Sequence, residues 1–186
     1  EGEEVLDLGD EMGWVPAHAA ARNGHTDVLT FIAETGRRGF NARNLHGSTP
    51  AHLAARGGHV ETLSLLSVHE GKALLTSADY DGWRPAHSAA RGGHVECLQF
   101  IADEVGSLPT DTQPKLADIA SSYSQTEVLS FLKTYGITEM VATIAKQVAE
   151  MDEAAQSKRG GHGLRFLVDP RTSKWIGWWD LVLSFA

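Results

Sequence analysis

Apolar residues recur at three- and four-residue steps in three stretches of the chain, at residues 28–32, 63–66 and 98–101. This spacing places apolar side chains on one face of an α-helix. An alanine-rich segment opened by proline precedes each stretch, and proline suits the first turn of a helix. The pattern therefore predicts three pairs of helices. The apolar positions of the second helices are Val28, Leu29, Phe31, Ile32, Leu63, Leu65, Leu66, Leu98, Phe100 and Ile101.

The helix pairs belong to an internal repeat. The stretches VPAHAAARNGHTDVL, TPAHLAARGGHVETL and RPAHSAARGGHVECL begin at Val15, Thr49 and Arg84, so the period is 34 or 35 residues. The second and third stretches agree at twelve of fifteen positions. A turn-forming segment precedes each one, at residues 10–13, 44–47 and 79–82. Because a single unit cannot bury its own apolar stripe, the units are expected to stack.

A fourth, degenerate copy follows in LADIASSYSQTEVLSFL. Here Asp118 replaces the histidine, and Ser124 and Gln125 replace the Gly-His pair. A terminal copy of this kind is expected to cap the stack with a more polar outer face. Gly136 is expected to mark its end.

The repeat resembles the ankyrin family, whose signature is T-P-L-H-x-A followed by A-A-x-x-G-H in units of about 33 residues. The family leucine is alanine in all three copies, and the family threonine remains only as Thr49. The resemblance implies an all-α solenoid of about four helix-turn-helix units with β-turn fingers over residues 10–135, plus an extra C-terminal helix. The matching residues are Pro16, His18, Ala20, Ala21, Gly24 and His25; Pro50, His52, Ala54, Ala55, Gly58 and His59; and Pro85, His87, Ala89, Ala90, Gly93 and His94.

Composition narrows the class of protein. The net charge of −8 argues against a nucleic-acid partner, which would require a basic patch or stripe. The first eleven residues carry six acidic and no basic side chains, and residues 1–9 are assigned to an acidic leader. The single cysteine, Cys97, excludes an internal disulfide and fits a reducing compartment. The opening on Glu1 and the apolar end suggest a fragment of a longer protein.

The residues that could carry chemistry have structural explanations. Six of the nine histidines lie in the repeat, but nothing in their spacing brings four zinc ligands together, so they are expected to bond backbone groups. Cys97 stands where Val28 and Thr62 stand in the other copies, which favours a packed thiol. The Gly-rich RGGHG at 159–163 lacks the spacing of a phosphate-binding loop. The sequence predicts no enzyme, no catalytic residue, no metal and no cofactor.

A recognition surface remains as the predicted function. In ankyrin stacks, partners bind the turn tips and the inner helix face, so the resemblance implies a protein partner there. Tryptophan, tyrosine and arginine dominate the energetics of interfaces. The alternative for Trp14 and Trp83 is that they only cover the adjacent helix. The predicted partner-binding residues are Met12, Trp14, Arg22, Leu45, His46, Ser48, Arg56, Tyr80, Asp81, Trp83 and Arg91.

Three further segments follow the repeats. Apolar residues at helical spacing predict an amphipathic helix at 136–157, which either covers the last repeat or couples it to another domain. Residues 158–174 form a base-rich linker that contains glycine. Residues 175–186 are apolar apart from Asp180, too short to cross a bilayer but long enough to begin a crossing. Membrane-interface roles are assigned to Trp175, Trp178 and Trp179.

The tail also resembles the start of the first transmembrane helix of voltage-gated and cyclic-nucleotide-gated-type potassium channels, through Asp169, Pro170, Ser173, Trp179 and Asp180. This resemblance implies the cytosolic N-terminal region of a multi-pass cation channel, on the cytoplasmic side of a membrane. The competing hypothesis is a free cytoplasmic ankyrin adaptor or inhibitor whose tail is a packed helix or an interfacial anchor.

Overall fold

The computed structural model describes residues 9–35, 39–109, 115–136, 144–147 and 150. Those residues form helices and connecting turns, with no strand among them. The chain divides into two compact parts, an N-terminal part, Glu1–Ile137, and a C-terminal part, Thr138–Ala186. The helices of the N-terminal part are α1 (Pro16–Asn23), α2 (Thr26–Glu34), η2 (Gly39–Asn41), α3 (Pro50–Gly57), α4 (Val60–Glu70), α5 (Ala73–Thr76), α6 (Pro85–Gly92), α7 (Val95–Val105), α8 (Leu116–Ser122) and a last helix at 126–136.

Proline and glycine set the ends of the first helix of each unit. Proline occupies the first position of α1, α3 and α6. The residue that ends each of these helices is a glycine in the left-handed conformation, with φ of 71° at Gly24, 80° at Gly58 and 85° at Gly93. Glycine adopts this conformation without the steric cost that a Cβ brings. The prolines confirm the helix starts that the sequence predicts.

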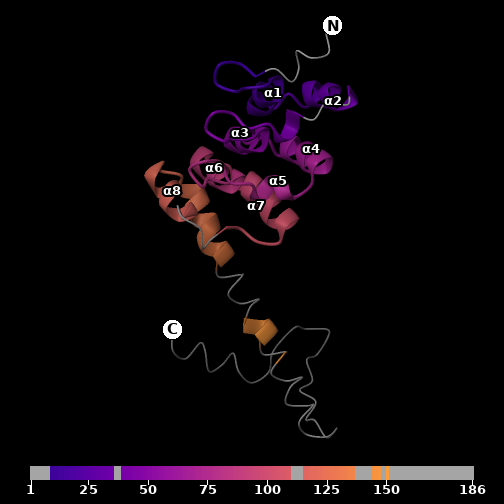
Figure 1. The fold of residues 1–186 in the computed structure, drawn as a ribbon. Helices are drawn as coiled ribbons and strands as arrows, with labels where there is room; N and C mark the ends of the chain where they lie inside the picture. Colours follow the sequence, from indigo (N-terminus) through magenta and orange to yellow (C-terminus); the bar gives the residue numbers. More distant parts are fainter. Residues whose placement is uncertain (1–8, 36–38, 110–114, 137–143, 148–149, 151–186) are drawn as a thin grey trace, which may run out of the picture. The chain divides into compact units, whose positions relative to one another are not determined.

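The helices stack in two rows (Figure 1). The first helices α1, α3, α6 and α8 contact one another in sequence, and so do the second helices α2, α4 and α7. Alanines let the first helices approach closely, because their side chains are single methyl groups. The alanines buried in this row are Ala17, Ala20, Ala21, Ala51, Ala54, Ala55, Ala86, Ala89, Ala90 and Ala120.

The second helices bury two large aliphatic residues each in the stack. These residues are Leu29 and Ile32 in α2, Leu63 and Leu66 in α4, and Leu98 and Ile101 in α7. In contrast, Val28 is 40% exposed and Phe31 58% exposed, although the sequence pattern assigned both to the apolar stripe. Within the described residues, α2 has a second-row neighbour on one side only, α4, and so its other side stays uncovered.

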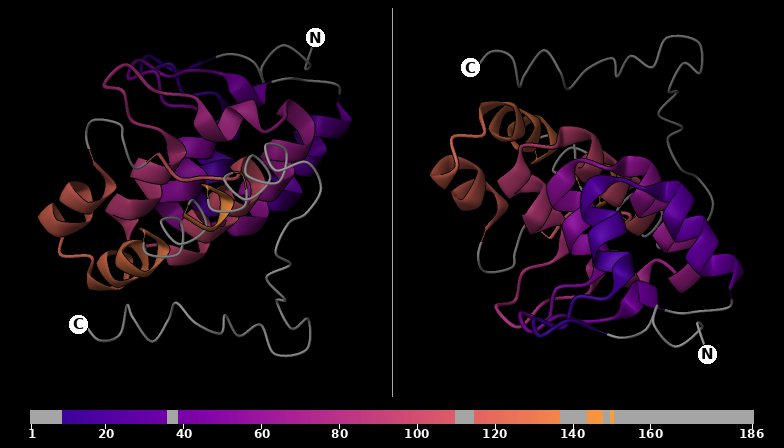
Figure 2. Two further views of the ribbon diagram at one scale, coloured as in Figure 1. Left: turned by 90° about the horizontal axis from the view of Figure 1, so that it is seen from below. Right: turned by 90° about the horizontal axis from the view of Figure 1, so that it is seen from above.

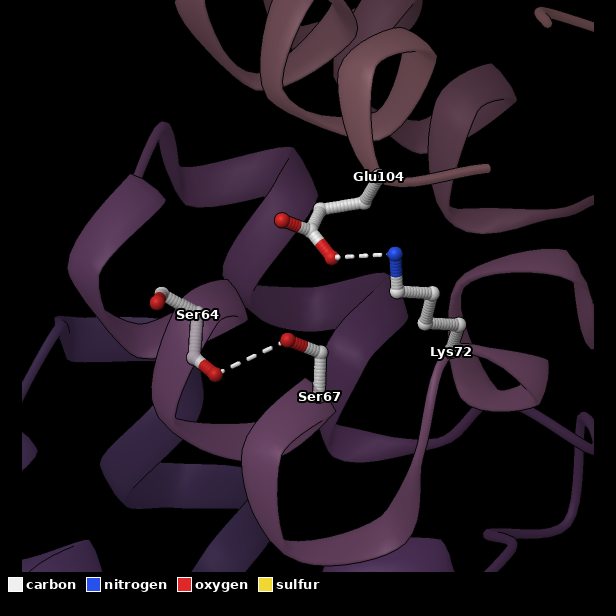
Figure 3. Close-up of polar contacts among 4 residues, drawn as sticks. All are labelled: Ser64, Ser67, Lys72 and Glu104. Atoms are coloured by element: carbon white, nitrogen blue, oxygen red, sulfur yellow. Dashed lines mark hydrogen bonds and ion pairs between the residues drawn. The ribbon is translucent and has the colours of Figure 1, made fainter. Parts of the chain in front are cut away.

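Two short helices connect the units, and the repeat pattern predicted neither. Phe40 in η2 and Leu74 and Leu75 in α5 are buried and enlarge the apolar core. Lys72, just before α5, forms an ion pair of 3.2 Å with Glu104 in α7, which links the second unit to the third (Figure 3). In α4, the Ser67 hydroxyl donates a hydrogen bond of 2.9 Å to the carbonyl oxygen of Ser64.

The degenerate fourth copy folds as a helix pair, α8 followed by the helix at 126–136. Leu116, Ile119 and Val128 are buried against the preceding unit. The outer side is polar, with Asp118, Ser121 and Ser122 exposed. Ser124 holds the left-handed conformation, with φ of 58°, where the other copies have glycine. The fourth copy therefore keeps the backbone of the repeat without its consensus residues.

In the C-terminal part of the chain, the structure describes residues 144–147 and 150, which are all helical and exposed. The Nζ atom of Lys146 lies 4.0 Å from Oε1 of Glu150, one helical turn further along the chain. The remainder of the predicted helix at 136–157, the linker at 158–174 and the tail with Trp175, Trp178 and Trp179 lie outside the described residues, as does most of the leader at 1–9. Of the helices that are described, none combines the length and the apolar character that a membrane span requires.

Candidate protein-recognition surface

Each of the first three units begins with a finger, a tight turn whose first residue is Asp10, Asn44 or Asp79. The side-chain Oδ1 of that residue accepts two backbone N–H groups of its own turn. For Asp79 these donors are Asp81 at 3.0 Å and Trp83 at 2.8 Å. Asp10 and Asn44 accept equivalent pairs. Because a side chain of the turn itself accepts these backbone N–H groups, local hydrogen bonds fix the shape of each finger.

The fingers are also joined to one another. The backbone N–H of Leu45 donates to the carbonyl oxygen of Met12 at 2.9 Å, and that of Tyr80 donates to the carbonyl oxygen of His46 at 3.0 Å. Figure 2 shows the fingers extending side by side beyond the helices. The ring of Tyr80 lies directly over Gly47, where a Cβ would come within 2.7 Å of a ring carbon. The fingers therefore form one connected ladder.

The finger tips expose large apolar side chains. Leu45 is 62% exposed, Tyr80 70% and Met12 47%. His46 and Asp81 are exposed beside them. Large apolar side chains that are exposed together on hydrogen-bonded fingers are typical of a surface that a partner covers.

The two tryptophans lie at the base of their fingers, half-buried. The ring of Trp14 is 5.9 Å from the ring of His18, and that of Trp83 is 6.3 Å from that of His87. Trp83 also packs against the apolar core. Each tryptophan thus covers the adjacent first helix and still leaves part of its ring at the surface. At the equivalent position of the second finger is Ser48, also half-buried, whose hydroxyl lies 3.4 Å from Asp79 Oδ2.

An arginine lies in the last turn of α1, α3 and α6, and two of the three lie beside these tryptophans. The guanidinium of Arg22 lies 5.7 Å from the centroid of the Trp14 ring, and that of Arg91 lies 5.9 Å from the Trp83 ring and 4.7 Å from the Tyr123 ring. These are cation–π distances. Arg56 lies between the other two, because α3 lies between α1 and α6. We call Arg22, Arg56 and Arg91 the arginine row.

The backbone of the arginine row is held by side chains of the following units. The Nε2–H of His59 donates to the carbonyl oxygen of Arg22 at 3.1 Å, and that of His94 donates to Arg56 at 3.0 Å. In the fourth unit, the side-chain amide of Gln125 donates to the carbonyl oxygen of Arg91 at 3.1 Å. Gln125 therefore does in the degenerate copy what histidine does in the others.

A second set of histidines, His18, His52 and His87, is buried at the starts of the first helices. The Nδ1 atom of each accepts the backbone N–H three residues earlier, and Nε2–H donates to the next finger where the partner is described: His18 to Ser48, and His52 to Trp83. Burial lowers the pKa of His18 and His52, against a smaller opposing effect of those backbone bonds. These histidines bond backbone groups, as the sequence predicts, and across the described part of the chain no three potential ligands gather for a metal.

Cys97 is fully buried in α7. Burial raises the pKa of its thiol to about 12, with further contributions from the nearby charges of Glu96 and Glu61. The thiol is therefore protonated at neutral pH, whereas a nucleophile would need the thiolate. The equivalent residue of α4, Thr62, is also fully buried.

The structure thus places the predicted partner-binding residues in three adjoining sets: the finger tips, the finger bases with Trp14, Ser48 and Trp83, and the arginine row. Three contributors escaped prediction. Tyr123 and Gln125 belong to the degenerate copy; the repeat alignment placed Gln125 at the histidine of the Gly-His pair, and the backbone-bonding role expected of that histidine could have been assigned to it. Arg43 joins the second finger to the third, donating to Gly47 and Ala78 carbonyl oxygens at 2.9 and 2.8 Å.

Comparison with protein families agrees with this architecture. A family model described as ankyrin repeats, in three copies, matches residues 2–72 and 17–113. The matches together span more than half of the 186 residues, so the chain belongs to the ankyrin-repeat family. The first match begins inside the segment assigned to the acidic leader. No curated protein is significantly similar to the chain in sequence. As a set of ankyrin repeats, the chain is a protein–protein interaction module, and no enzyme family is indicated.

Proposed function

We propose that the finger tips and the adjoining first helices bind a protein partner. The observation that carries the proposal is the exposure of Leu45 and Tyr80, 62% and 70%, on fingers that backbone hydrogen bonds join into one ladder. Binding to a preformed surface loses little conformational entropy, so more of the contact energy remains as affinity. Tyrosine contributes a large contact area with few rotatable bonds.

Affinity capture tests this surface. The 186-residue chain is immobilised and incubated with an extract of cells that express it, alongside the double variant Leu45→Ala/Tyr80→Ala and the control Val68→Ala. Val68 is 78% exposed on α4, away from the fingers, so it matches the lost apolar exposure. Proteins that bind the wild-type chain and Val68→Ala but not the double variant support the proposal. Retention of every captured protein by the double variant would exclude the finger tips.

The cellular context is a finer proposal, and it rests on the sequence of the tail. Asp169, Pro170, Ser173, Trp179 and Asp180 match the start of the first transmembrane helix in potassium-type channels, and basic residues precede the apolar run. We therefore propose that the module lies on the cytoplasmic side of a membrane, as the N-terminal region of a multi-pass cation channel. A free cytoplasmic adaptor or inhibitor is the competing function.

Two measurements separate these alternatives. If Trp175, Trp178 and Trp179 attach the protein to a membrane, the 186-residue chain should co-sediment with lipid vesicles. A chain that ends at residue 157 should stay in the supernatant. Equal sedimentation of both chains contradicts membrane attachment. A transcript that continues in frame beyond the codon for Ala186 into further apolar segments supports the channel, whereas a stop codon at that point supports the adaptor.

A further inference from the structure

Among the residues that the structure describes, no acidic side chain neutralises the positive charge of the arginine row. Among the described residues, the guanidinium groups of Arg22, Arg56 and Arg91 form no ion pair with a carboxylate, and the ion pairs in that part of the chain join other residues. The chain as a whole has a net charge of −8, so carboxylates are plentiful elsewhere on it. A row of arginines kept apart from them is a local exception to the charge of the molecule.

The spacing of the row is fixed by the fold. The three arginines occupy the last turn of α1, α3 and α6, and the backbone carbonyl of each accepts a hydrogen bond from the next unit. Packed helices lie roughly 8–10 Å apart, so successive arginines are separated by about that distance. A peptide in the extended polyproline II conformation rises about 3.1 Å per residue with three residues per turn, so side chains three residues apart share one face and match this spacing.

Arg56 differs from its two neighbours. Trp14 flanks Arg22, and Trp83 and Tyr123 flank Arg91. The finger position that carries tryptophan in units one and three is Ser48 in unit two, and in the described residues no aromatic ring stacks on Arg56. The Arg56 guanidinium is thus the member of the row that has no aromatic ring over its face among the described residues.

The electrostatics of Arg56 agree with an uncompensated charge. Partial burial lowers the pKa of its guanidinium, and the charges of Arg91 and Arg22 lower it further, while Tyr123 has an opposing effect. Arginine remains protonated at neutral pH despite such shifts. A carboxylate placed there would relieve the mutual repulsion of the row and would accept two parallel N–H bonds from the guanidinium.

We propose that Arg22, Arg56 and Arg91 bind an extended acidic segment of the partner protein, with a glutamate or aspartate side chain paired to Arg56. This proposal rests on the proposed function and names the chemistry of the partner. Three evenly spaced cations favour several side-chain carboxylates over a single C-terminal carboxylate. The acidic net charge of the chain disfavours long polyanions such as nucleic acid.

The test measures binding of a fluorescent, end-blocked peptide with glutamate at every third of twelve positions, by anisotropy at low ionic strength with the 186-residue chain. A second peptide has glutamine in place of every glutamate, and a third has phosphoserine. Arg56→Gln is compared with Lys133→Gln, which makes the same charge change on the exposed side of the helix at 126–136. Thermal unfolding of both variants is recorded as well.

The proposal predicts that the glutamate peptide binds and the glutamine peptide does not. It predicts that Arg56→Gln weakens the affinity about tenfold, whereas Lys133→Gln changes it less than twofold. Equal binding of both peptides, an equal loss in both variants, or strong preference for the phosphoserine peptide would each overturn it. Capture that depends on Leu45 and Tyr80, without glutamate binding, would remove only this inference and leave the proposed function standing.

Discussion

The Nε2–H of His59 donates a hydrogen bond to the backbone carbonyl of Arg22 at 3.1 Å, across 37 residues of sequence. This bond joins the second unit to the end of the first helix of the preceding unit. The ring of His59 also occupies the space beside Gly24, where a Cβ would come within 2.5 Å of Nδ1. Glycine is therefore required at this position by the neighbouring unit as well as by its own backbone conformation.

Replacing one of these glycines tests that double requirement. At Gly58, with φ of 80°, a Cβ would lie 2.6 Å from Nδ1 of His94 and would displace the ring that bonds Arg56. We expect Gly58→Ala to lower the free energy of unfolding by about 3 kcal/mol, measured by urea denaturation. Gly106→Ala is the control, since φ is 90° there but no atom of the described residues would lie within 4 Å of the added Cβ. It should cost about 1 kcal/mol, and equal losses would show that the ring contact adds nothing.

The fourth unit gives a second test of the contacts between units. Gln125 donates to the carbonyl oxygen of Arg91 where histidine would stand in the repeat. Gln125→Ala should lower the free energy of unfolding by about 1 kcal/mol, because the carbonyl loses its partner. Gln125→His should restore most of that loss, since the imidazole N–H supplies an equivalent donor. If histidine were as destabilising as alanine, the fourth unit would not be equivalent to the others.

Much of this architecture can be predicted from the sequence, because equivalent residues make equivalent contacts in each repeat. The period of 34 or 35 residues, with Pro16, Gly24 and their equivalents, predicts the helix pairs and their ends. The role of Gln125 is harder to predict, since an amide and an imidazole share a donor and little else. The short helix α5 has no counterpart in the repeat pattern. In this helix the side chains of Leu74 and Leu75 are buried and cover the apolar core between units.

The surface was predictable in its residue types and less so in its geometry. Sequence placed Trp14, Trp83 and the three arginines near the same face. The stacking of Arg91 on Tyr123 depends on how the fourth unit docks, which the degenerate copy does not specify. The exposure of Phe31 in an apolar stripe also depends on which helices neighbour α2, and helical periodicity carries no information about that.

The buried histidines predict a dependence of stability on pH. Burial lowers the pKa of His18 and His52 in the folded chain below the unfolded value near 6.5. The unfolded chain therefore binds protons that the folded chain does not, so their contribution is complete above pH 6.5 and declines as the pH falls below it. Each histidine should remove up to about 1.4 kcal/mol per pH unit in that window. Urea denaturation at several pH values between 7.5 and 5.0 measures this dependence.

Thr62 offers a substitution that should stabilise the stack. Its side chain is fully buried, and in the described residues its hydroxyl has no hydrogen-bond partner. Thr62→Val keeps the shape and removes the unsatisfied group, so we expect the free energy of unfolding to rise by about 1 kcal/mol. Thr49→Val provides the contrast, because the Thr49 hydroxyl lies 2.9 Å from His52 Nδ1 and its loss should destabilise. A decrease in stability for Thr62→Val would mean that the hydroxyl is satisfied.

The most direct test of protein recognition by the finger tips is site-specific photo-crosslinking. A benzophenone amino acid is placed at position 80 in one chain and at position 68 in another, since Tyr80 and Val68 are similarly exposed, 70% and 78%, on different faces. Both chains are irradiated in an extract of cells that express the protein, and the adducts are identified by mass spectrometry. The account predicts a discrete partner adduct at position 80 that is absent at position 68. Adducts that are the same at both positions, or confined to position 68, would contradict it.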